Sequence, residues 1–98
     1  MTRVEMYATP YCPYCVRARQ LLADKGVDVE EFDVSMNPAL RAEMMERSNR
    51  WTVPQIFIDG IHVGGSDDLI LANRSGELDR LLSGVAETRP DTNPTTPV

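Results

Sequence analysis

The sequence predicts a single α/β domain in which a four-stranded mixed sheet is flanked by helices. Apolar residues recur with strand and helix periods in the order strand, helix, strand, helix, strand, strand, helix. The first two strands are separated by a helix, which favours a parallel pair. The last two strands are joined by Asp59-Gly60, a strong hairpin signal. A hairpin added to a parallel pair makes the sheet mixed.

Turn and capping residues place the individual elements. Pro13 is tolerated in the first turn of a helix, and Gly26 ends that helix. Asn37-Pro38 opens the second helix, and Ser66-Asp67-Asp68 is expected to cap the third. The expected strands cover residues 3–8, 27–34, 54–58 and 61–64, and the expected helices cover residues 13–25, 39–48, 69–73 and 77–82.

Length and composition indicate one folded unit and a tail. The chain has 98 residues, of which 42% are hydrophobic and 26% charged, an ordinary balance for one globular domain. From about Gly84 the apolar content falls and Pro, Thr and Asn dominate. We therefore predict a domain over residues 1–83 and a disordered C-terminal tail over residues 84–98.

Charge and hydropathy exclude several classes of function. The net charge of -5 argues against nucleic acid and anionic membranes as partners, because both need a basic surface. No run approaches the roughly 20 apolar residues of a membrane span. The N-terminal residues lack the apolar stretch of a secretory signal, so we expect the protein in the reducing cytoplasm. We also expect a monomer.

The chemistry is concentrated in Cys12-Pro13-Tyr14-Cys15, which holds the only two cysteines. They fall at the start of the first helix, directly after the first strand, which is the thioredoxin-like arrangement. The N-terminus of a helix stabilises a thiolate, so Cys12 is the expected nucleophile and Cys15 the more buried resolving thiol. Two unrelated core cysteines are the alternative, which spacing and position disfavour. One histidine and two cysteines fall short of a zinc site, so no metal is expected.

Two distant motifs outline a cleft for these thiols. A cis bond in Val53-Pro54 would expose the Val53 backbone to an extended peptide, although trans is the commoner isomer for X-Pro bonds. The Gly64–Asp68 turn offers helix N–H groups to a carboxylate. Asp67 either pairs with a ligand ammonium or is favoured there by the helix dipole. Tyr14 either forms a wall beside the substrate disulfide or is a surface aromatic. Together the motifs suit a small zwitterionic peptide.

Other side chains are weaker candidates. Arg50 either binds a ligand carboxylate or is solvated, and Trp51 either lies on the rim of the cleft or covers the core. His62 is placed on the outer face of the fourth strand, with a catalytic role disfavoured. Glu43 and Arg47 are interpreted as a solvated helix face.

The chain resembles the dithiol glutaredoxins of bacteria. The matching segments are Cys12-Pro13-Tyr14-Cys15, Thr52-Val53-Pro54-Gln55-Ile56-Phe57-Ile58 and Gly64-Gly65-Ser66-Asp67-Asp68, within about residues 3 to 83. The resemblance implies a thioredoxin-like fold with a cis bond before Pro54. It implies glutathione-dependent reduction of protein disulfides and glutathione mixed disulfides. The implied glutathione-binding residues are Tyr14, Thr52, Val53, Pro54, Gly65, Ser66 and Asp67.

One position departs from the family pattern. Many relatives carry a lysine in the loop before the cysteines, where this chain has Thr9. Loss of that cation is expected to raise the pKa of Cys12 and to weaken glutathione binding. Arg17 or Arg50 could replace it.

Two other functions remain as alternatives. In one, Cys12 from each of two subunits and two glutathione thiols hold an iron–sulfur cluster, although Pro13 stiffens the loop against it. In the other, the protein is a dithiol donor fed by thioredoxin reductase. The expected function is a glutathione-dependent thiol–disulfide oxidoreductase.

Overall fold

A computed structural model describes residues 2–83, and the expected tail over residues 84–98 lies outside the described part. Its strands are β1 (Val4–Ala8), β2 (Val29–Asp33), β3 (Gln55–Ile58) and β4 (Ile61–Gly64), and its helices are α1 (Pro13–Asp24), α2 (Pro38–Ser48), α3 (Ser66–Ser75) and α4 (Glu77–Ser83). The order agrees with the prediction. The four strands form one sheet in the order β2-β1-β3-β4, with β1 parallel to β2 and antiparallel to β3. The predicted thioredoxin-like α/β fold with a mixed sheet is confirmed.

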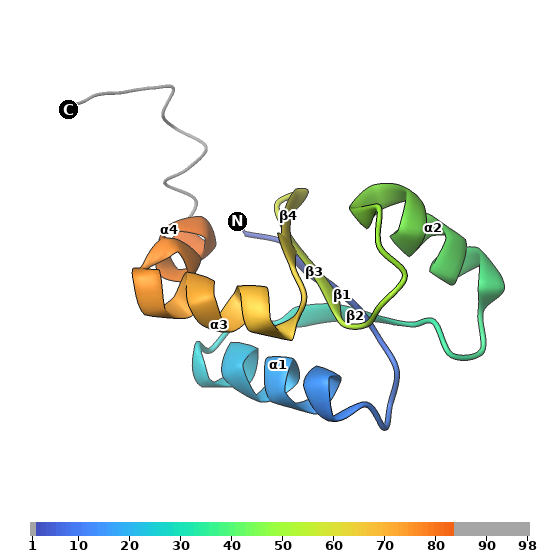
Figure 1. Ribbon diagram of the computed structural model, residues 1–98. Coiled ribbons are helices and arrows are strands. Elements are labelled where there is room, and N and C mark those ends of the chain that lie inside the picture. The colour runs from blue at the N-terminus through green and yellow to red at the C-terminus, as the bar shows by residue number, and fades with distance from the viewer. Residues whose placement is uncertain (1, 84–98) are drawn as a thin grey trace.

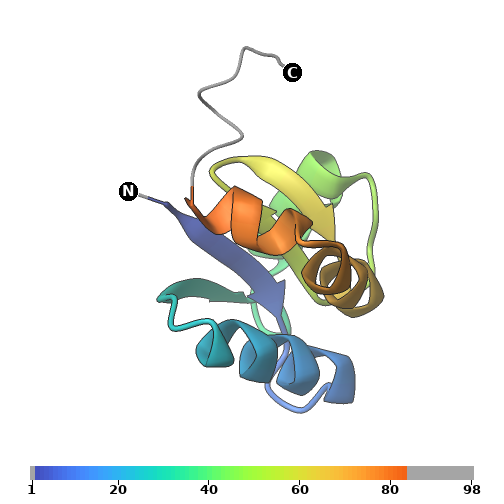
Figure 2. The ribbon, with the colours of Figure 1, turned by 90° about the vertical axis from the view of Figure 1, so that its left-hand side faces the viewer.

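Helices cover both faces of the sheet. Figures 1 and 2 show α1 and α2 on opposite sides of the strands, with α3 on the side of α1. A first core cluster joins the strands to α1, α3 and α4; its buried members are Val4, Met6, Ala8, Cys15, Ala18, Leu22, Ile56, Ile58, Leu69, Leu78 and Leu81. A smaller cluster beneath α2 is made of Tyr7, Val34, Met44 and Phe57. Because successive side chains of a strand point to opposite faces, the residues of β1 contribute alternately to these two clusters.

The interface between α2 and the sheet is more polar than the sequence predicted. The Tyr7 O–H donates to Glu43, and Arg47 Nη1 donates to the Tyr7 oxygen at 2.7 Å. Arg47 also pairs with Glu5 at 3.1 Å and lies 4.0 Å from the centroid of the Phe57 ring. Glu43 and Arg47 are exposed, as expected of a solvated helix face, but their charged ends also contact the sheet, which the sequence did not predict. The reason is that polar Glu5 and Tyr7 lie on the strand beneath them, so the charged helix residues have partners there.

The third helix is longer than predicted. It begins at Ser66 rather than Leu69 because Gly65 is its N-cap, and the Asp68 carboxylate accepts a hydrogen bond from the Gly65 N–H at 2.9 Å. Ser66-Asp67-Asp68 therefore form the first turn instead of preceding it. Gly76, with φ of 86°, ends the helix as expected from Ser75-Gly76.

Candidate active site

The cysteine pair lies where β1 leads into α1. Cys12 is the N-cap residue of α1, with extended backbone angles of φ -77° and ψ 123°, and Pro13 is the first helical residue. Cys15 lies one turn further along the helix. Both are free thiols; Cys15 is fully buried, whereas Cys12 is partly exposed. An accessible sulfur therefore stands at the positive end of the helix, with a second sulfur behind it.

The two thiols differ in acidity. Partial burial raises the pKa of Cys12, but the backbone N–H and thiol of Cys15 and the backbone N–H of Tyr14 lower it, and the net pKa lies below the ordinary value of 9.0. Burial raises the pKa of Cys15, and its interaction with Cys12 raises it further. A negative charge on the pair is therefore carried more easily by Cys12.

Within residues 2–83, neither Arg17 nor Arg50, the two arginines considered as substitutes for the missing lysine, is among the groups that lower the pKa of Cys12. The groups that lower the Cys12 pKa there belong to Tyr14 and Cys15. Arg50 is paired with Asp68, and Arg17 lines a groove between α1 and α3. The expected effect of Thr9 on the Cys12 pKa, relative to lysine, remains a prediction.

The segment before β3 approaches the turn before α3. The Val53–Pro54 peptide bond is cis, as the resemblance implied and against the general preference for trans. Thr52 is exposed, Val53 is half-buried, and Pro54 is buried. A Cβ placed on Gly65 would lie 3.4 Å from the Pro54 carbonyl oxygen, so these two backbones are nearly in contact. Cys12 and Val53 also pack against the same core cluster.

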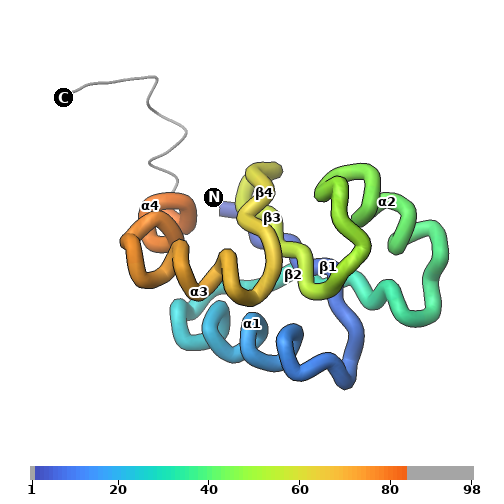
Figure 3. Tube along the Cα trace, viewed as in Figure 1, coloured from blue at the N-terminus to red at the C-terminus, as the bar shows by residue number. Residues whose placement is uncertain are grey.

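A charged contact joins the same two segments. Arg50, in the loop between α2 and β3, donates from Nη1 to Asp68 Oδ2 at 2.9 Å. Figure 3 shows this loop descending beside the start of α3. Gly64 has a φ of 121°, and a Cβ there would overlap the Asp68 carboxylate, so glycine is required at this position. Arg50 is thus held by Asp68 rather than merely solvated.

The remaining predicted site residues differ in exposure. The Tyr14 ring faces outward and is 55% exposed, and Asp67 is exposed in the first turn of α3. Ser66 is 5% exposed, and its Oγ has no hydrogen-bond partner within residues 2–83. A buried hydroxyl without a partner is costly, so Ser66 leaves an unmet hydrogen-bonding group at the start of α3. Trp51 is 73% exposed and therefore does not cover the core.

Sequence reasoning missed a pair of polar residues on the α2 side of the sheet. His62 was expected on an outer face, but it is half-buried, its ring centroid lies 4.9 Å from that of Phe57, and its Nε2 contacts Gln55 Oε1 at 2.7 Å. Gln55 is fully buried and donates to Thr52. The available signal was an amide in an otherwise apolar strand, since a buried amide needs partners.

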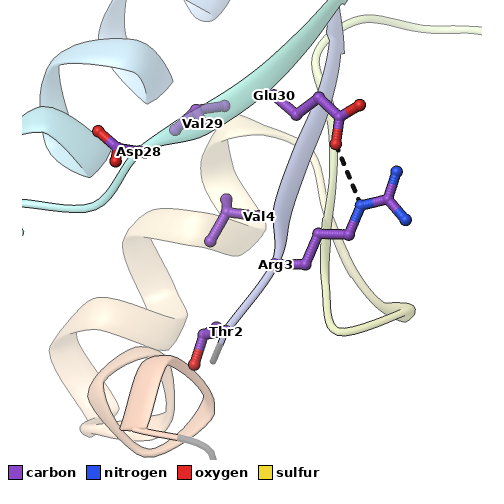
Figure 4. Close-up of a pocket in the computed structure, with 6 residues that line it drawn as sticks. All are labelled: Thr2, Arg3, Val4, Asp28, Val29 and Glu30. Carbon is purple, nitrogen blue, oxygen red and sulfur yellow. Dashed lines mark hydrogen bonds and ion pairs between the residues drawn. The ribbon is translucent and has the colours of Figure 1, made fainter.

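A hollow of about 420 Å³ lies away from the cysteines, at the beginning of β1 and β2. Figure 4 shows its lining residues, with the Arg3 guanidinium turned to the Glu30 carboxylate and paired at 3.1 Å. Within residues 2–83, no helix is long and apolar enough to cross a membrane. In the same range, no cluster of three or more His, Cys, Asp or Glu residues is arranged to hold a metal ion.

Comparisons with known proteins agree with this geometry. The glutaredoxin family model matches residues 4–63, more than half of the chain. The chain is 52% identical over 83 residues to a glutaredoxin of Pseudomonas aeruginosa, covering 85% of this chain and 99% of that protein. It is also 52% identical over 82 residues to glutaredoxin 3 of Escherichia coli, covering 84% and 99%.

Solved structures give the same result. The solution structure of a Brucella melitensis glutaredoxin is 56% identical, with a TM-score of 0.74, covering 84% of this chain and 89% of that one. A crystal structure of a buckwheat glutaredoxin–glutathione complex is 26% identical, with a TM-score of 0.78, covering 87% and 80%. The cysteine pair at the start of α1, the overall topology and these similarities lead to one conclusion: the chain belongs to the glutaredoxin family, and it is a glutathione-dependent thiol–disulfide oxidoreductase.

Proposed function

We propose that Cys12 is the nucleophile and Cys15 the resolving thiol of this oxidoreductase. With a glutathionylated protein, the Cys12 thiolate attacks the glutathione sulfur. A bond forms between Cys12 and glutathione, the original disulfide breaks, and the protein thiolate leaves and takes up a proton. A second glutathione thiolate then attacks this adduct. Oxidised glutathione leaves, and the Cys12 thiolate is regenerated.

With a protein disulfide, the same attack gives a disulfide between Cys12 and the substrate. The Cys15 thiol loses its proton and attacks Cys12, which releases the substrate as a dithiol and leaves a Cys12–Cys15 disulfide. Two glutathione molecules reduce that disulfide. Cys15 is therefore needed for protein disulfides but not for removal of glutathione.

The observation that carries this assignment is the contrast between the two thiols. The Cys12 sulfur is accessible and its pKa is lowered, whereas Cys15 is buried and its pKa is raised. The first thiol to attack must be accessible and ionised, and the second needs only to reach its neighbour.

We further propose that glutathione binds across the cysteine loop, the segment before β3 and the start of α3. The residues assigned to it are Tyr14, Thr52, Val53, Pro54, Gly65, Ser66 and Asp67. The close approach of the Gly65 backbone to the Pro54 carbonyl supports a continuous surface. The buried Ser66 hydroxyl and the N–H groups of α3 suit the γ-glutamyl carboxylate, while the Asp67 carboxylate suits its ammonium.

The experiment compares two serine variants on a glutathionylated peptide, with glutathione and glutathione reductase. Cys12→Ser should abolish turnover, whereas Cys15→Ser should retain it, because glutathione itself resolves the adduct. On a protein disulfide, both variants should be strongly impaired. Turnover of the glutathionylated peptide by Cys12→Ser would refute the assignment.

The setting of this activity is also a proposal. We place the protein in the cytoplasm, as a monomer acting on disulfide and glutathionylated proteins, with residues 1–83 as the catalytic domain. The enzymatic role is preferred to a glutathione-ligated iron–sulfur dimer because Pro13 stiffens the cysteine loop. It is preferred to a reductase-fed donor because Ser66 and the α3 turn offer polar groups to glutathione. Faster reduction by thioredoxin reductase than by glutathione would reverse the second preference.

A further inference from the structure

A chain of hydrogen bonds runs from β4 to the loop that precedes β3. His62 Nε2 contacts Gln55 Oε1 at 2.7 Å. Gln55 Nε2 in turn donates to the Thr52 carbonyl oxygen at 3.1 Å and to the Thr52 hydroxyl oxygen at 3.2 Å. Gln55 is fully buried, His62 is half-buried, and Thr52 is exposed. This series of hydrogen bonds therefore connects a buried amide to a surface residue that we assign to glutathione binding.

The direction of each hydrogen bond in this chain is determined. The Thr52 carbonyl can only accept, so Gln55 must turn its NH₂ group toward Thr52 and its carbonyl oxygen toward His62. An oxygen facing His62 Nε2 requires that this nitrogen carry the hydrogen. A flipped Gln55 amide would place an oxygen against the Thr52 carbonyl. The Thr52 carbonyl and the His62 N–H therefore favour the same orientation of the buried amide, one from each end.

The Thr52 hydroxyl is oriented as a consequence. Its oxygen accepts from Gln55, so its own hydrogen must point elsewhere, and Thr52 is exposed. The Thr52 hydroxyl can therefore donate its hydrogen to an acceptor at the surface. Glutathione carries two carboxylates and two peptide carbonyls, all of which accept hydrogen bonds.

The His62 ring is well placed to hold this arrangement. It packs on Phe57 with an interplanar angle of 31°, directly across the strand pair. Burial lowers its pKa, Arg50 and Arg47 lower it further, and Asp68 raises it. The neutral ring, with its hydrogen on Nε2, is therefore the relevant form at neutral pH.

We propose that His62 is a positioning residue that, through Gln55, presents the Thr52 hydroxyl as a hydrogen-bond donor to glutathione. This inference rests on the proposed function, because it assumes that Thr52 contacts glutathione. It assigns a role in glutathione affinity to a residue of the edge strand that does not itself touch the substrate. The thiol chemistry at Cys12 is unaffected.

The first test compares His62→Phe with His62→Gln. Phenylalanine keeps the ring on Phe57 but removes the donor, whereas glutamine offers an amide N–H near the position of Nε2. Loss of about one hydrogen bond corresponds to a roughly fivefold change. His62→Phe should therefore raise the KM for glutathione about fivefold with kcat nearly unchanged, and His62→Gln should restore most of the affinity. Ile61→Gln, on the other face of the same strand, is the matched control and should match wild type.

A wild-type KM in His62→Phe would overturn the inference, as would a KM raised equally in His62→Phe and His62→Gln, or in His62→Phe and Ile61→Gln. Thr52→Val provides the second arm. In that background His62→Phe should add little to the KM, because the hydroxyl is already absent, and additive effects would contradict the proposal. A wild-type KM in Thr52→Val would remove both the inference and the Thr52 contact. Wild-type protein without glutathione-dependent turnover would instead refute the proposed function.

A measurement on the unaltered protein covers the case in which His62→Phe does not fold. Long-range ¹H–¹⁵N correlation of the histidine ring reports which nitrogen carries the hydrogen. The proposal requires the Nε2–H form. Observation of the Nδ1–H form at neutral pH would overturn it.

Discussion

At the scale of single residues, the two cysteines show what spacing can predict. The pattern Cys12-Pro13-Tyr14-Cys15 after a strand was enough to place one thiol at a helix end and the other a turn further in. The groups that set their acidity could not be predicted in the same way. The Cys12 pKa is lowered by the backbone of Tyr14 and by Cys15, which depends on the exact path of the loop.

The absence of a lysine at position 9 gives a prediction about Cys12. Thr9→Lys should lower the Cys12 pKa further, because a cation near the sulfur favours the thiolate. Thr9→Met, with a long but uncharged side chain, is the matched control. The ultraviolet absorbance of the thiolate, followed against pH, gives the pKa of each variant. Equal pKa values in the two variants would show that this position has no electrostatic effect on Cys12.

At this scale, the features that the sequence did not predict were contacts between polar side chains of different elements. His62 and Gln55 were present in the sequence, but their pairing requires β3 and β4 in register. Arg50 and Asp68 are 18 positions apart and meet only in the folded chain. Sequence spacing is informative within a helix or hairpin, whereas these contacts depend on tertiary structure.

At the scale of elements, the sequence predicted a helix start near residues 66–68 but not the residue at which α3 begins. Glycines and acidic residues indicated a helix start, yet the cap is Gly65 and the helix takes in Ser66 and Asp67. The cause is the Asp68 side chain, which turns back to the Gly65 N–H and pairs with Arg50. Both contacts require a residue without a Cβ at position 64, because a Cβ there would overlap the Asp68 carboxylate.

Removal of the Asp68 carboxylate, which accepts from the N–H of the cap residue Gly65, should destabilise the fold. Asp68→Ala is expected to cost about 0.5–2 kcal/mol at neutral pH, the usual range for loss of an N-terminal cap. Asp67→Ala, the exposed neighbour in the same turn, is the control and should cost less. Chemical unfolding of the three proteins measures the difference. Equal stability of Asp68→Ala and wild type would contradict the role assigned to this carboxylate.

The same cap predicts a dependence on pH. The Gly65 N–H and Arg50 lower the pKa of Asp68 below its ordinary value of 3.8. Because the folded-state pKa is lowered, the stabilisation is present above the unfolded value and is lost as the pH falls through the folded value. The free energy of unfolding, measured over an acidic pH series, should therefore become more similar for wild type and Asp68→Ala as the pH falls. A gap that stays constant into strong acid would contradict this linkage.

At the scale of the whole molecule, the fold could be predicted because periodicity, turns and motif order agreed with one another. The parallel pair, the hairpin and the sheet order follow from that agreement. The contact between α2 and the sheet was not predicted, because charged residues on a helix usually indicate solvent. Glu5 is only 6% exposed and is satisfied by Arg47 and Arg3. A buried carboxylate in a strand can thus draw a charged residue of an exposed helix face into contact with the sheet.

The proposed domain boundary is testable by truncation. The buried residues of both core clusters lie between Val4 and Leu81, and the Thr2 hydroxyl donates to the Leu82 carbonyl at 2.7 Å. A chain ending at Ser83 should therefore keep the stability and the glutathione-dependent activity of the full chain. A chain ending at Gly76, which lacks Leu78 and Leu81, should be strongly destabilised. A large loss on removal of residues 84–98 would contradict the proposed boundary.

The central claim is that Cys12 forms the covalent intermediate with glutathione. It is tested most directly by trapping that intermediate in Cys15→Ser with oxidised glutathione and mapping the adduct by mass spectrometry. We predict one glutathionyl group, located on Cys12 and released by added glutathione. Failure of Cys15→Ser to form this adduct, or a glutathionyl group on Cys15 of the Cys12→Ser variant that supports turnover, would contradict the account.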